Sequence, residues 1–160
     1  LDPGLAFGTG THPTTRMCLR WTAAHAPVGP RVLDYGCGSG ILAIGAALHG
    51  ATQVDAVDID EAAVGATRDN AAANGVKLNA VGLPDAAQGV YDTVLANILA
   101  TPLKVLAPLL CQYVAPGGAL VLAGVLERQT AELQQAYAEY LPLEVADTED
   151  GWVLLVARRA

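Results

Sequence analysis

Three glycines at alternate positions follow an acid at the end of an apolar run, and this pattern can bind a ligand through backbone groups. The segment reads V-L-D-Y-G-C-G-S-G over residues 32–40, with the acid at Asp34 and the glycines at Gly36, Gly38 and Gly40. An apolar helical pattern begins directly after it. A strand, a tight turn and a helix start of this kind let the backbone approach a ligand closely.

The position of the acid and the glycine spacing indicate which ligand this turn accepts. Dinucleotide-binding folds use G-x-G-x-x-G and place a pyrophosphate at the helix N-terminus. Here the third glycine comes one position early, at Gly40, and Asp34 would repel a pyrophosphate. A carboxylate at this turn suits a ligand that carries an ammonium group or another donor.

A second acid, Asp58, directly follows the next apolar run, Gln53–Val57. The carboxyl ends of neighbouring parallel strands meet at one edge of an open α/β sheet, where ligands bind. We therefore expect Asp34 and Asp58 to lie at that edge, where Asp58 can accept both hydroxyls of a ribose. Asp60 is the alternative ribose ligand, but its simpler interpretation is the N-cap of the following helix.

The opening residues 1–15, L-D-P-G-L-A-F-G-T-G-T-H-P-T-T, contain three glycines and two prolines. Such a composition excludes a regular element and predicts a loop that feeds a helix N-terminus and is suited to folding over a ligand. His12 in this segment is either a base or cofactor contact, or a local helix cap. The second interpretation is the more common one for a lone histidine beside a proline.

Helical and strand-like patterns alternate along the chain, which predicts an α/β fold with a mostly parallel sheet and helices on both faces. The last two strands, joined by the acidic residues 147–151, are expected to form an antiparallel hairpin. The patterns predict helices over 13–25, 39–49, 61–73, 102–113 and 127–140, and strands over 31–35, 53–57, 77–81, 93–96, 119–123, 143–146 and 152–157.

Length and composition favour one domain over residues 1–160, with 52% hydrophobic residues and no apolar run long enough for a bilayer span. The cysteines, Cys18, Cys37 and Cys111, show neither metal-ligand spacing nor a disulfide framework, which favours a reducing cytoplasm. The net charge of −7 argues against direct nucleic-acid binding and favours a basic protein partner, unless it is ordinary acidity. The start at Leu1 suggests that an upstream portion is missing.

The opening segment closely resembles the signature of PrmA-type enzymes, which methylate large-subunit ribosomal protein eleven. The stretches D-I-D at 58–60, R-D-N-A at 68–71, N-G at 74–75 and A-N-I-L-A at 96–100 match the same family. The glycine turn with its leading acid resembles the first motif of class I methyltransferases. The resemblance implies a Rossmann-like, seven-stranded sheet whose last strand lies antiparallel beside the fifth, and S-adenosylmethionine as cofactor, converted to S-adenosylhomocysteine.

By position, the resemblance assigns roles to single residues. Thr15, Gly36 and its neighbours, and Asp58 would contact the cofactor, and Asn97 would lie between the cofactor and the acceptor amine. Related amino-group methyltransferases often follow this asparagine with two prolines and an aromatic residue, whereas Ile98, Leu99 and Ala100 follow it here. This departure fits a looser acceptor site. In the family, both lysine side chains and the N-terminal amine of the ribosomal protein are methylated, and an additional N-terminal domain recognises it.

The chemistry of methyl transfer to nitrogen explains an asparagine at position 97. The amine lone pair must point along the line of displacement, and an amide oxygen that accepts amine hydrogens can aim it. An amide is no base at neutral pH, so the amine arrives deprotonated or loses its proton to water. The alternative is that Asn97 caps the helix expected near Pro102 or satisfies a turn.

Two other functions remain open at this point: a nucleotide-dependent oxidoreductase on a similar sheet, and a methyltransferase fold kept only for protein contacts. The glycine spacing argues against the first, and the intact Asp34, Asp58 and Asn97 argue against the second. We assign no metal site. Structural positions are expected for Cys37 in the turn, for His25 and His49 at helix ends, and for Trp21 and Trp152 in the core.

Overall fold

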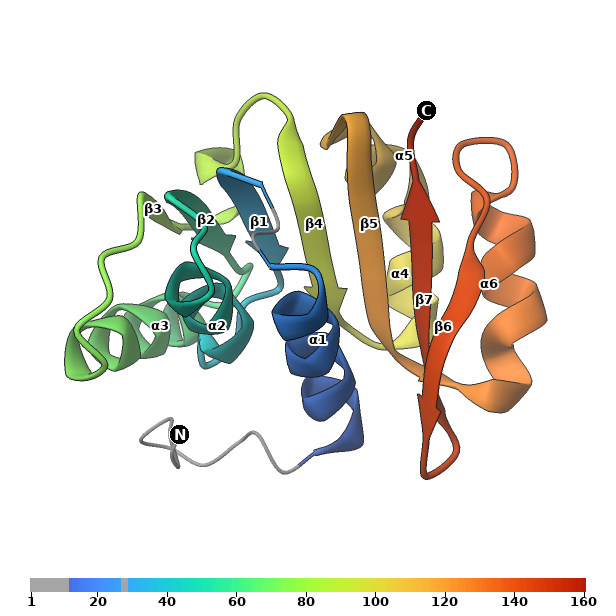
Figure 1. Ribbon diagram of the computed structural model, residues 1–160, viewed down its shortest axis with the longest axis horizontal. Helices are drawn as coiled ribbons and strands as arrows, with labels where there is room; N and C mark the ends of the chain where they lie inside the picture. Colours follow the sequence, from blue (N-terminus) through green and yellow to red (C-terminus); the bar gives the residue numbers. More distant parts are fainter. Residues whose placement is uncertain (1–11, 27–28) are drawn as a thin grey trace.

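Seven strands form one sheet: β1 (Arg31–Tyr35), β2 (Gln53–Val57), β3 (Ala80–Gly82), β4 (Tyr91–Asn97), β5 (Val114–Leu126), β6 (Glu144–Glu149) and β7 (Trp152–Arg158). Their spatial order is β3-β2-β1-β4-β5-β7-β6 (Figure 1). Strands β1 to β5 are parallel, and β7 is antiparallel to both β5 and β6. The computed structural model describes residues 12–26 and 29–160, so most of the predicted opening loop lies outside the described residues.

Helices cover both faces of this sheet, as the alternating patterns predict (Figure 1). Helices α1 (Pro13–Ala24), α2 (Ile41–Leu48) and α3 (Glu61–Ala73) pack on one face. Helices α4 (Ala100–Val105), α5 (Ala107–Gln112) and α6 (Thr130–Tyr137) pack on the other face. There are also two short 3-10 helices among the described residues, η2 (Pro84–Ala86) and η3 (Glu127–Gln129). The Rossmann-like class, the seven strands and the antiparallel C-terminal hairpin are confirmed.

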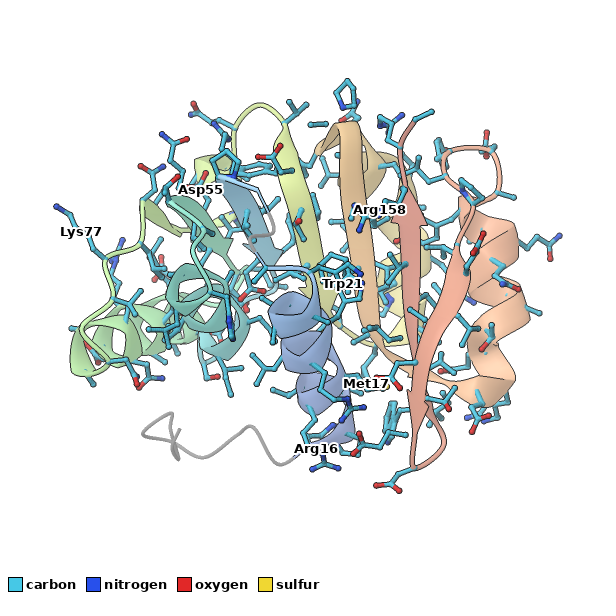
Figure 2. All side chains as sticks on the ribbon, viewed as in Figure 1. Arg16, Met17, Trp21, Asp55, Lys77 and Arg158 are labelled. Carbon is cyan, nitrogen blue, oxygen red and sulfur yellow. The ribbon has the colours of Figure 1, made fainter. Side chains whose placement is uncertain are left out.

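The core is divided by the sheet into two apolar clusters, because both faces of the central strands are buried. Leu33 and Leu120 belong to the cluster under α4 to α6, whereas Val32 belongs to the cluster under α1 to α3. Figure 2 shows Met17 and Trp21 on α1, and both are buried against the sheet. Burial on both faces explains why these strands are continuous apolar runs rather than alternating patterns.

The prediction of one continuous helix over residues 102–113 is wrong. The chain forms two short helices, α4 and α5, that meet at Leu106. Pro108 lacks the backbone donor and clashes with the carbonyl four residues earlier, so a helix cannot pass through it unbroken. It occupies instead the start of α5, where a proline is tolerated.

Other differences lie at the ends of elements. The third strand is Ala80–Gly82 rather than 77–81, because pairing with β2 begins only where Ala80 meets Asp55. The fifth strand is Val114–Leu126 rather than 119–123, and an irregularity inside it separates the Val114 and Ala119 pairings with β4. Residues 147–149, predicted as part of the connection, belong to β6. The other predicted elements form, with ends shifted by no more than three residues, and η3 forms the start of the predicted 127–140 helix.

Candidate active site

The glycine turn after β1 has a backbone that only glycine adopts easily. Gly36, Gly38 and Gly40 have φ values of 81°, 53° and 87°. A Cβ on Gly36 would lie 2.9 Å from the Ile98 side chain, and one on Gly40 would lie 2.8 Å from Thr67. A Cβ on Gly38 would meet no atom of the described structure within 4 Å. The outer glycines are therefore required for packing, and the middle one borders space that a ligand can use.

Hydrogen bonds hold this turn against the end of β2. The amides of Gly36 and Cys37 donate to the Val57 carbonyl at 2.8 and 2.9 Å. The amide of Gly38 donates to Asp58 Oδ2 at 2.9 Å. The turn and the second predicted acid are thus brought into direct contact, as expected from their positions at neighbouring strand ends.

Asp58 is half-buried at the end of β2. Its Oδ1 accepts from the amide of Asp60 at 2.9 Å, and its Oδ2 accepts from Gly38. Each carboxylate oxygen can accept more than one hydrogen bond, so the group retains capacity for hydroxyl donors. Asp60 is the N-cap of α3, because its side chain accepts from the Ala62 amide at 2.9 Å. The helix-cap interpretation of Asp60 is confirmed.

Asp34 is more deeply placed than its expected contact with a ligand suggests. Only 1% of it is exposed, and its Oδ2 accepts from the Ala43 amide of α2 at 3.0 Å. Burial raises the pKa of Asp34 to about 7, with a smaller contribution from the charge of Asp58, while the Ala43 hydrogen bond opposes the shift. The side chain therefore ties β1 to α2 beneath the glycine turn.

Asn97 ends β4 beside the first turn of α1. Its Nδ2 donates to Thr15 Oγ1 at 3.5 Å, so two residues 82 positions apart meet at this edge. An amide that donates through nitrogen presents its oxygen as an acceptor. Next to it is a hollow of about 360 Å³, lined by His12, Thr14, Asn97, Ile98, Leu99, Gly124 and Trp152. Its walls are mixed, with amide, hydroxyl, imidazole, indole and aliphatic groups.

His12 is the N-cap of α1, which confirms its interpretation as a local cap. Its Nδ1 accepts from the Thr14 amide at 3.2 Å and lies 2.8 Å from Thr14 Oγ1. Its ring meets the Trp152 ring edge-on, with centroids 5.3 Å apart. The nitrogen that caps the helix is engaged, so His12 contributes to the wall of the hollow rather than to proton transfer through that atom.

Gly124 and Trp152 were missed as site residues. Gly124 has φ +88°, and a Cβ there would lie 2.3 Å from the Ile98 carbonyl oxygen. Ile98 therefore packs between Gly124 and the glycine turn. The signal in the sequence was a lone glycine inside an apolar strand, which indicates a bulge or a close approach. Trp152, expected in the core, packs against the core cluster under α1 to α3 but is only half-buried, and it also lines the hollow.

Cys37 is confirmed as a structural residue. Burial, with a smaller effect of the Asp34 charge, raises the pKa of its thiol to about 12, and Thr67 Oγ1 donates to its sulfur at 3.2 Å. The thiol stays protonated at neutral pH and is no nucleophile.

Among residues 12–26 and 29–160, no group of three or more His, Cys, Asp or Glu side chains has a metal-binding arrangement. Nor does any helix in those ranges have the length and apolarity of a membrane span.

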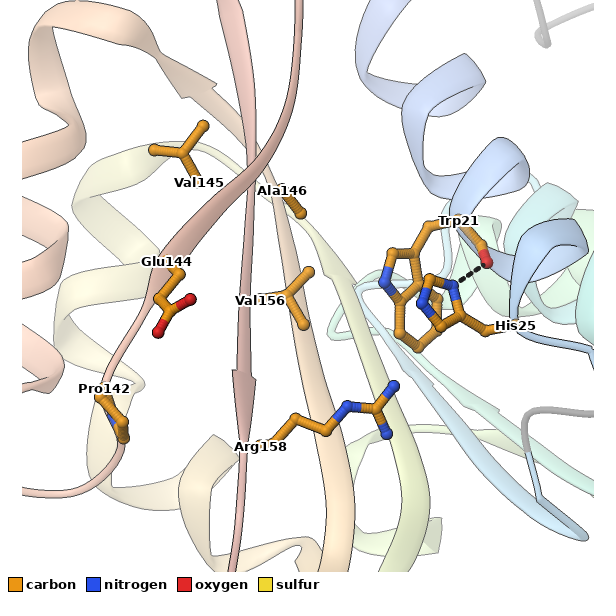
Figure 3. A pocket seen from close by; sticks show the side chains of 8 residues that line it. All are labelled: Trp21, His25, Pro142, Glu144, Val145, Ala146, Val156 and Arg158. Carbon is orange, nitrogen blue, oxygen red and sulfur yellow. Dashed lines mark hydrogen bonds between the residues drawn. The ribbon is translucent and has the colours of Figure 1, made fainter.

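A larger hollow, about 470 Å³, lies at the opposite end of α1, between that helix and β6–β7 (Figure 3). Trp21, His25, Glu144 and Arg158 are among its lining residues. His25 Nδ1 donates to the Trp21 carbonyl at 2.8 Å, and the two rings stack at 4.3 Å. None of the predicted site residues lines this hollow. The strand ends, where open α/β sheets bind ligands, are therefore the better candidate despite the smaller volume.

Known proteins resemble the chain over its whole length. The family described as "Ribosomal protein L11 methyltransferase (PrmA)" matches residues 1–160. A protein of Polaromonas sp. (strain JS666) named ribosomal protein L11 methyltransferase is 71% identical over 162 residues, covering 99% of this chain and 54% of that protein. A namesake from Bordetella parapertussis is 60% identical, covering 97% of this chain and 50% of that protein. The chain thus spans about half the length of the curated relatives it matches.

Solved structures of methyltransferases also resemble this chain. A crystal structure of a ribosomal protein L11 methylase from Lactobacillus delbrueckii subsp. bulgaricus has a TM-score of 0.82 and 33% identity, covering 94% of this chain and 81% of that one. The 16S rRNA N2 G1207 methyltransferase of T. thermophilus, solved with AdoMet and guanosine, has a TM-score of 0.76 and 21% identity, covering 96% of this chain and 45% of that one. At that identity the second likeness shows the fold alone.

The burial of Asp34 predicts how stability depends on pH. Its folded pKa, about 7, lies above the ordinary value of 3.8, so between these values the folded chain keeps a proton that the unfolded chain loses. Stability is therefore lost as pH rises through this window. In urea unfolding, wild type should lose about 2 kcal/mol relative to Asp34→Asn between about pH 5 and pH 8. The exposed Asp69→Asn is the matched control, and parallel profiles for wild type and Asp34→Asn would contradict the assignment.

Proposed function

The chain belongs to the ribosomal protein L11 methyltransferase (PrmA) family, and we propose that it transfers methyl groups from S-adenosylmethionine to amino groups of ribosomal protein L11. The reaction class is that of an S-adenosylmethionine-dependent protein N-methyltransferase, with S-adenosylhomocysteine as product. The acceptors proposed are lysine side chains and the N-terminal amine. One observation carries the proposal: the glycine turn, Asp58 and Asn97 meet at adjacent strand ends, where this fold binds ligands.

The two alternative functions are not favoured. An oxidoreductase would require a glycine spacing that this turn lacks, and the family match is to methyltransferases. A non-catalytic binding module would have no use for a ligand-sized hollow beside Asn97 or for the acid that is tied to Gly38. The geometry supports a site in which a cofactor and an acceptor meet.

The cofactor is proposed to lie across the glycine turn. Gly38 would face its methionine portion, since its Cβ position is open, and Asp58 would accept the ribose hydroxyls. Thr15 would contact it from the first turn of α1. Asp34 is buried, so its proposed action on the cofactor ammonium is through its charge beneath the turn rather than through an exposed surface. An ammonium group nearby would favour the ionised form of Asp34.

When bound, S-adenosylmethionine supplies a methyl carbon on a positively charged sulfur. Asn97 would accept a hydrogen of the acceptor amine through its amide oxygen and so aim the nitrogen lone pair at that carbon. With the cofactor bound, the nitrogen–carbon bond would form as the carbon–sulfur bond breaks, and the electron pair would stay on sulfur. The amine proton leaves to water, because the amide of Asn97 is no base. Leu99 and Trp152 would flank the aliphatic part of the acceptor.

The partner proposed is a basic ribosomal protein, which the net charge of −7 complements. No direct nucleic-acid contact is proposed, and the reaction would take place in the cytoplasm. Residues 1–160 are proposed to form one catalytic domain. Recognition of the whole ribosomal protein would use a further domain, in keeping with the length of the relatives.

Calorimetric titration of the chain in parallel with S-adenosylmethionine, S-adenosylhomocysteine and NAD tests the proposed cofactor. We expect the first two to bind and NAD to give no signal. Incubation with S-adenosylmethionine and purified ribosomal protein L11, followed by mass spectrometry, should show added methyl groups. Binding of NAD in place of S-adenosylmethionine would overturn the proposal.

Asp58→Ala should weaken S-adenosylmethionine binding about 10- to 100-fold, because hydrogen bonds to a charged acceptor are lost. The neighbouring Asp60→Ala is the matched control, since Asp60 caps α3 instead, and its dissociation constant should stay near that of wild type. Calorimetry measures both. Equal affinities of Asp58→Ala and wild type would remove Asp58 from the ribose site.

Asn97→Ala should lower the rate of methyl transfer about 100-fold, because the acceptor amine loses its alignment. Its affinity for S-adenosylmethionine should change less than about threefold, which is under 1 kcal/mol. Single-turnover transfer and calorimetry on the same preparation separate the two effects. A proportional loss of binding and transfer would reassign Asn97 to cofactor binding.

A further inference from the structure

Two arginines of α1 hold one acid of the β6–β7 hairpin. Arg16 Nε donates to Glu149 Oε2 at 2.6 Å, and Arg16 Nη2 contacts the same oxygen. Arg20 Nη1 lies 2.7 Å from Glu149 Oε1, and Arg20 Nη2 donates to Asp147 Oδ2 at 2.9 Å. Both oxygens of Glu149 are therefore engaged by α1. We call this cluster, Arg16, Arg20, Asp147 and Glu149, the α1 clamp.

The clamp acts on the part of α1 that enters the candidate site (Figure 2, in which Arg16 is labelled). Arg16 directly follows Thr15, which contacts Asn97. Glu149 is paired across the hairpin with Trp152, whose ring meets His12. Glu149 itself does not line the hollow beside Asn97. It is linked to the hollow through Trp152, which lines it, and to Asn97 through Arg16 and Thr15.

Packing and the α1 clamp hold different sides of α1, since Thr14 and Thr15 are buried along with the body of the helix, whereas Arg16 and Arg20 bind acids of the hairpin. Met17 and Trp21 are buried against the sheet, so the body of the helix stays attached without any ion pair. The first turn of α1 borders the hollow, and Arg16 attaches this turn to Glu149 of the hairpin. The 3.5 Å contact of Thr15 with Asn97 is long for a hydrogen bond, so a small rotation of this turn would break it.

The geometry of the clamp is better than that of an ordinary surface pair. Isolated exposed ion pairs contribute little because both side chains lose freedom and salt screens them. Here one carboxylate binds two guanidinium groups, and the Glu149 side chain is 21% exposed. The two arginines lower the pKa of Glu149, so it remains charged at neutral pH.

We propose that Glu149 is a positioning residue, which through Arg16 orients the first turn of α1 and keeps Thr15 in place to contact the cofactor. This inference rests on the proposed function, because Thr15 matters only if S-adenosylmethionine binds at this edge. The residue acts on the site without touching the cofactor. Its removal should therefore change binding while leaving the fold in place.

A double-mutant cycle measured by calorimetry with S-adenosylmethionine tests the assignment. Glu149→Gln and Thr15→Ala should each weaken binding about tenfold, as expected for one lost or misaligned hydrogen bond. The double variant should be no weaker than the single variants, because both remove the same contact between Thr15 and the cofactor. Arg16→Gln should reproduce Glu149→Gln and replaces it in the cycle if Glu149→Gln does not fold.

The matched control is Glu132→Gln, which removes the Lys104–Glu132 ion pair between α4 and α6 on the other face of the sheet. The thermal midpoint of Glu149→Gln should fall somewhat more than that of Glu132→Gln, because Glu149 binds two guanidinium groups, and only Glu149→Gln should lose affinity. Equal affinities of these two variants, an additive double variant, or a Thr15→Ala variant that binds like wild type would each overturn the positioning role. Failure of wild type to bind S-adenosylmethionine would instead overturn the proposed function.

Discussion

The position of β1 between β2 and β4 is the constraint on which the geometry of the candidate site depends. Strands β2 and β3 lie on one side of β1, and β4 and β5 lie on the other. The direction of strand addition therefore reverses at β1. The register places Asp34 opposite both Ala56 and Leu95, and the amides of Gly36 and Cys37 continue the pairing as far as Val57. The glycine turn, Asp58 and Asn97 therefore end at one edge.

At this edge of the sheet, features that lower the stability of the fold lie beside contacts that compensate for them. Three glycines lose more backbone freedom on folding than other residues would, and Asp34 is held in a buried position that disfavours its charge. Ile98 and Thr67 fill the space beside the outer glycines, and the Ala43 amide satisfies one oxygen of Asp34. The α1 clamp adds a peripheral support that lies outside the hollow. Departures from ideal local structure of this kind are expected where a site is built.

Prediction from sequence succeeded where one pattern determined the element. The strand over Arg31–Tyr35 and the helix over Glu61–Ala73 form with the predicted bounds, because apolar periodicity and clear end signals agree there. It failed where a local signal was overlooked, as at Pro108 within the predicted 102–113 helix. It also failed where pairing with a distant strand decides the ends, as in the extension of β6 through residues 147–149.

The sequence by itself determined the fold class, because helical and strand-like patterns alternate, and it determined the glycine turn and the ribose candidate Asp58, because each is a residue type directly after an apolar strand. The acceptor candidate Asn97 followed from the resemblance to the PrmA family. The tertiary structure alone decided that Asp34 is buried against α2, that Trp152 lines the hollow, and that Glu149 holds the first turn of α1. Arg16 and Glu149 are 133 residues apart. Periodicity reports which face of an element is buried, but it carries no information on which distant segment covers that face. That choice follows from strand order and packing.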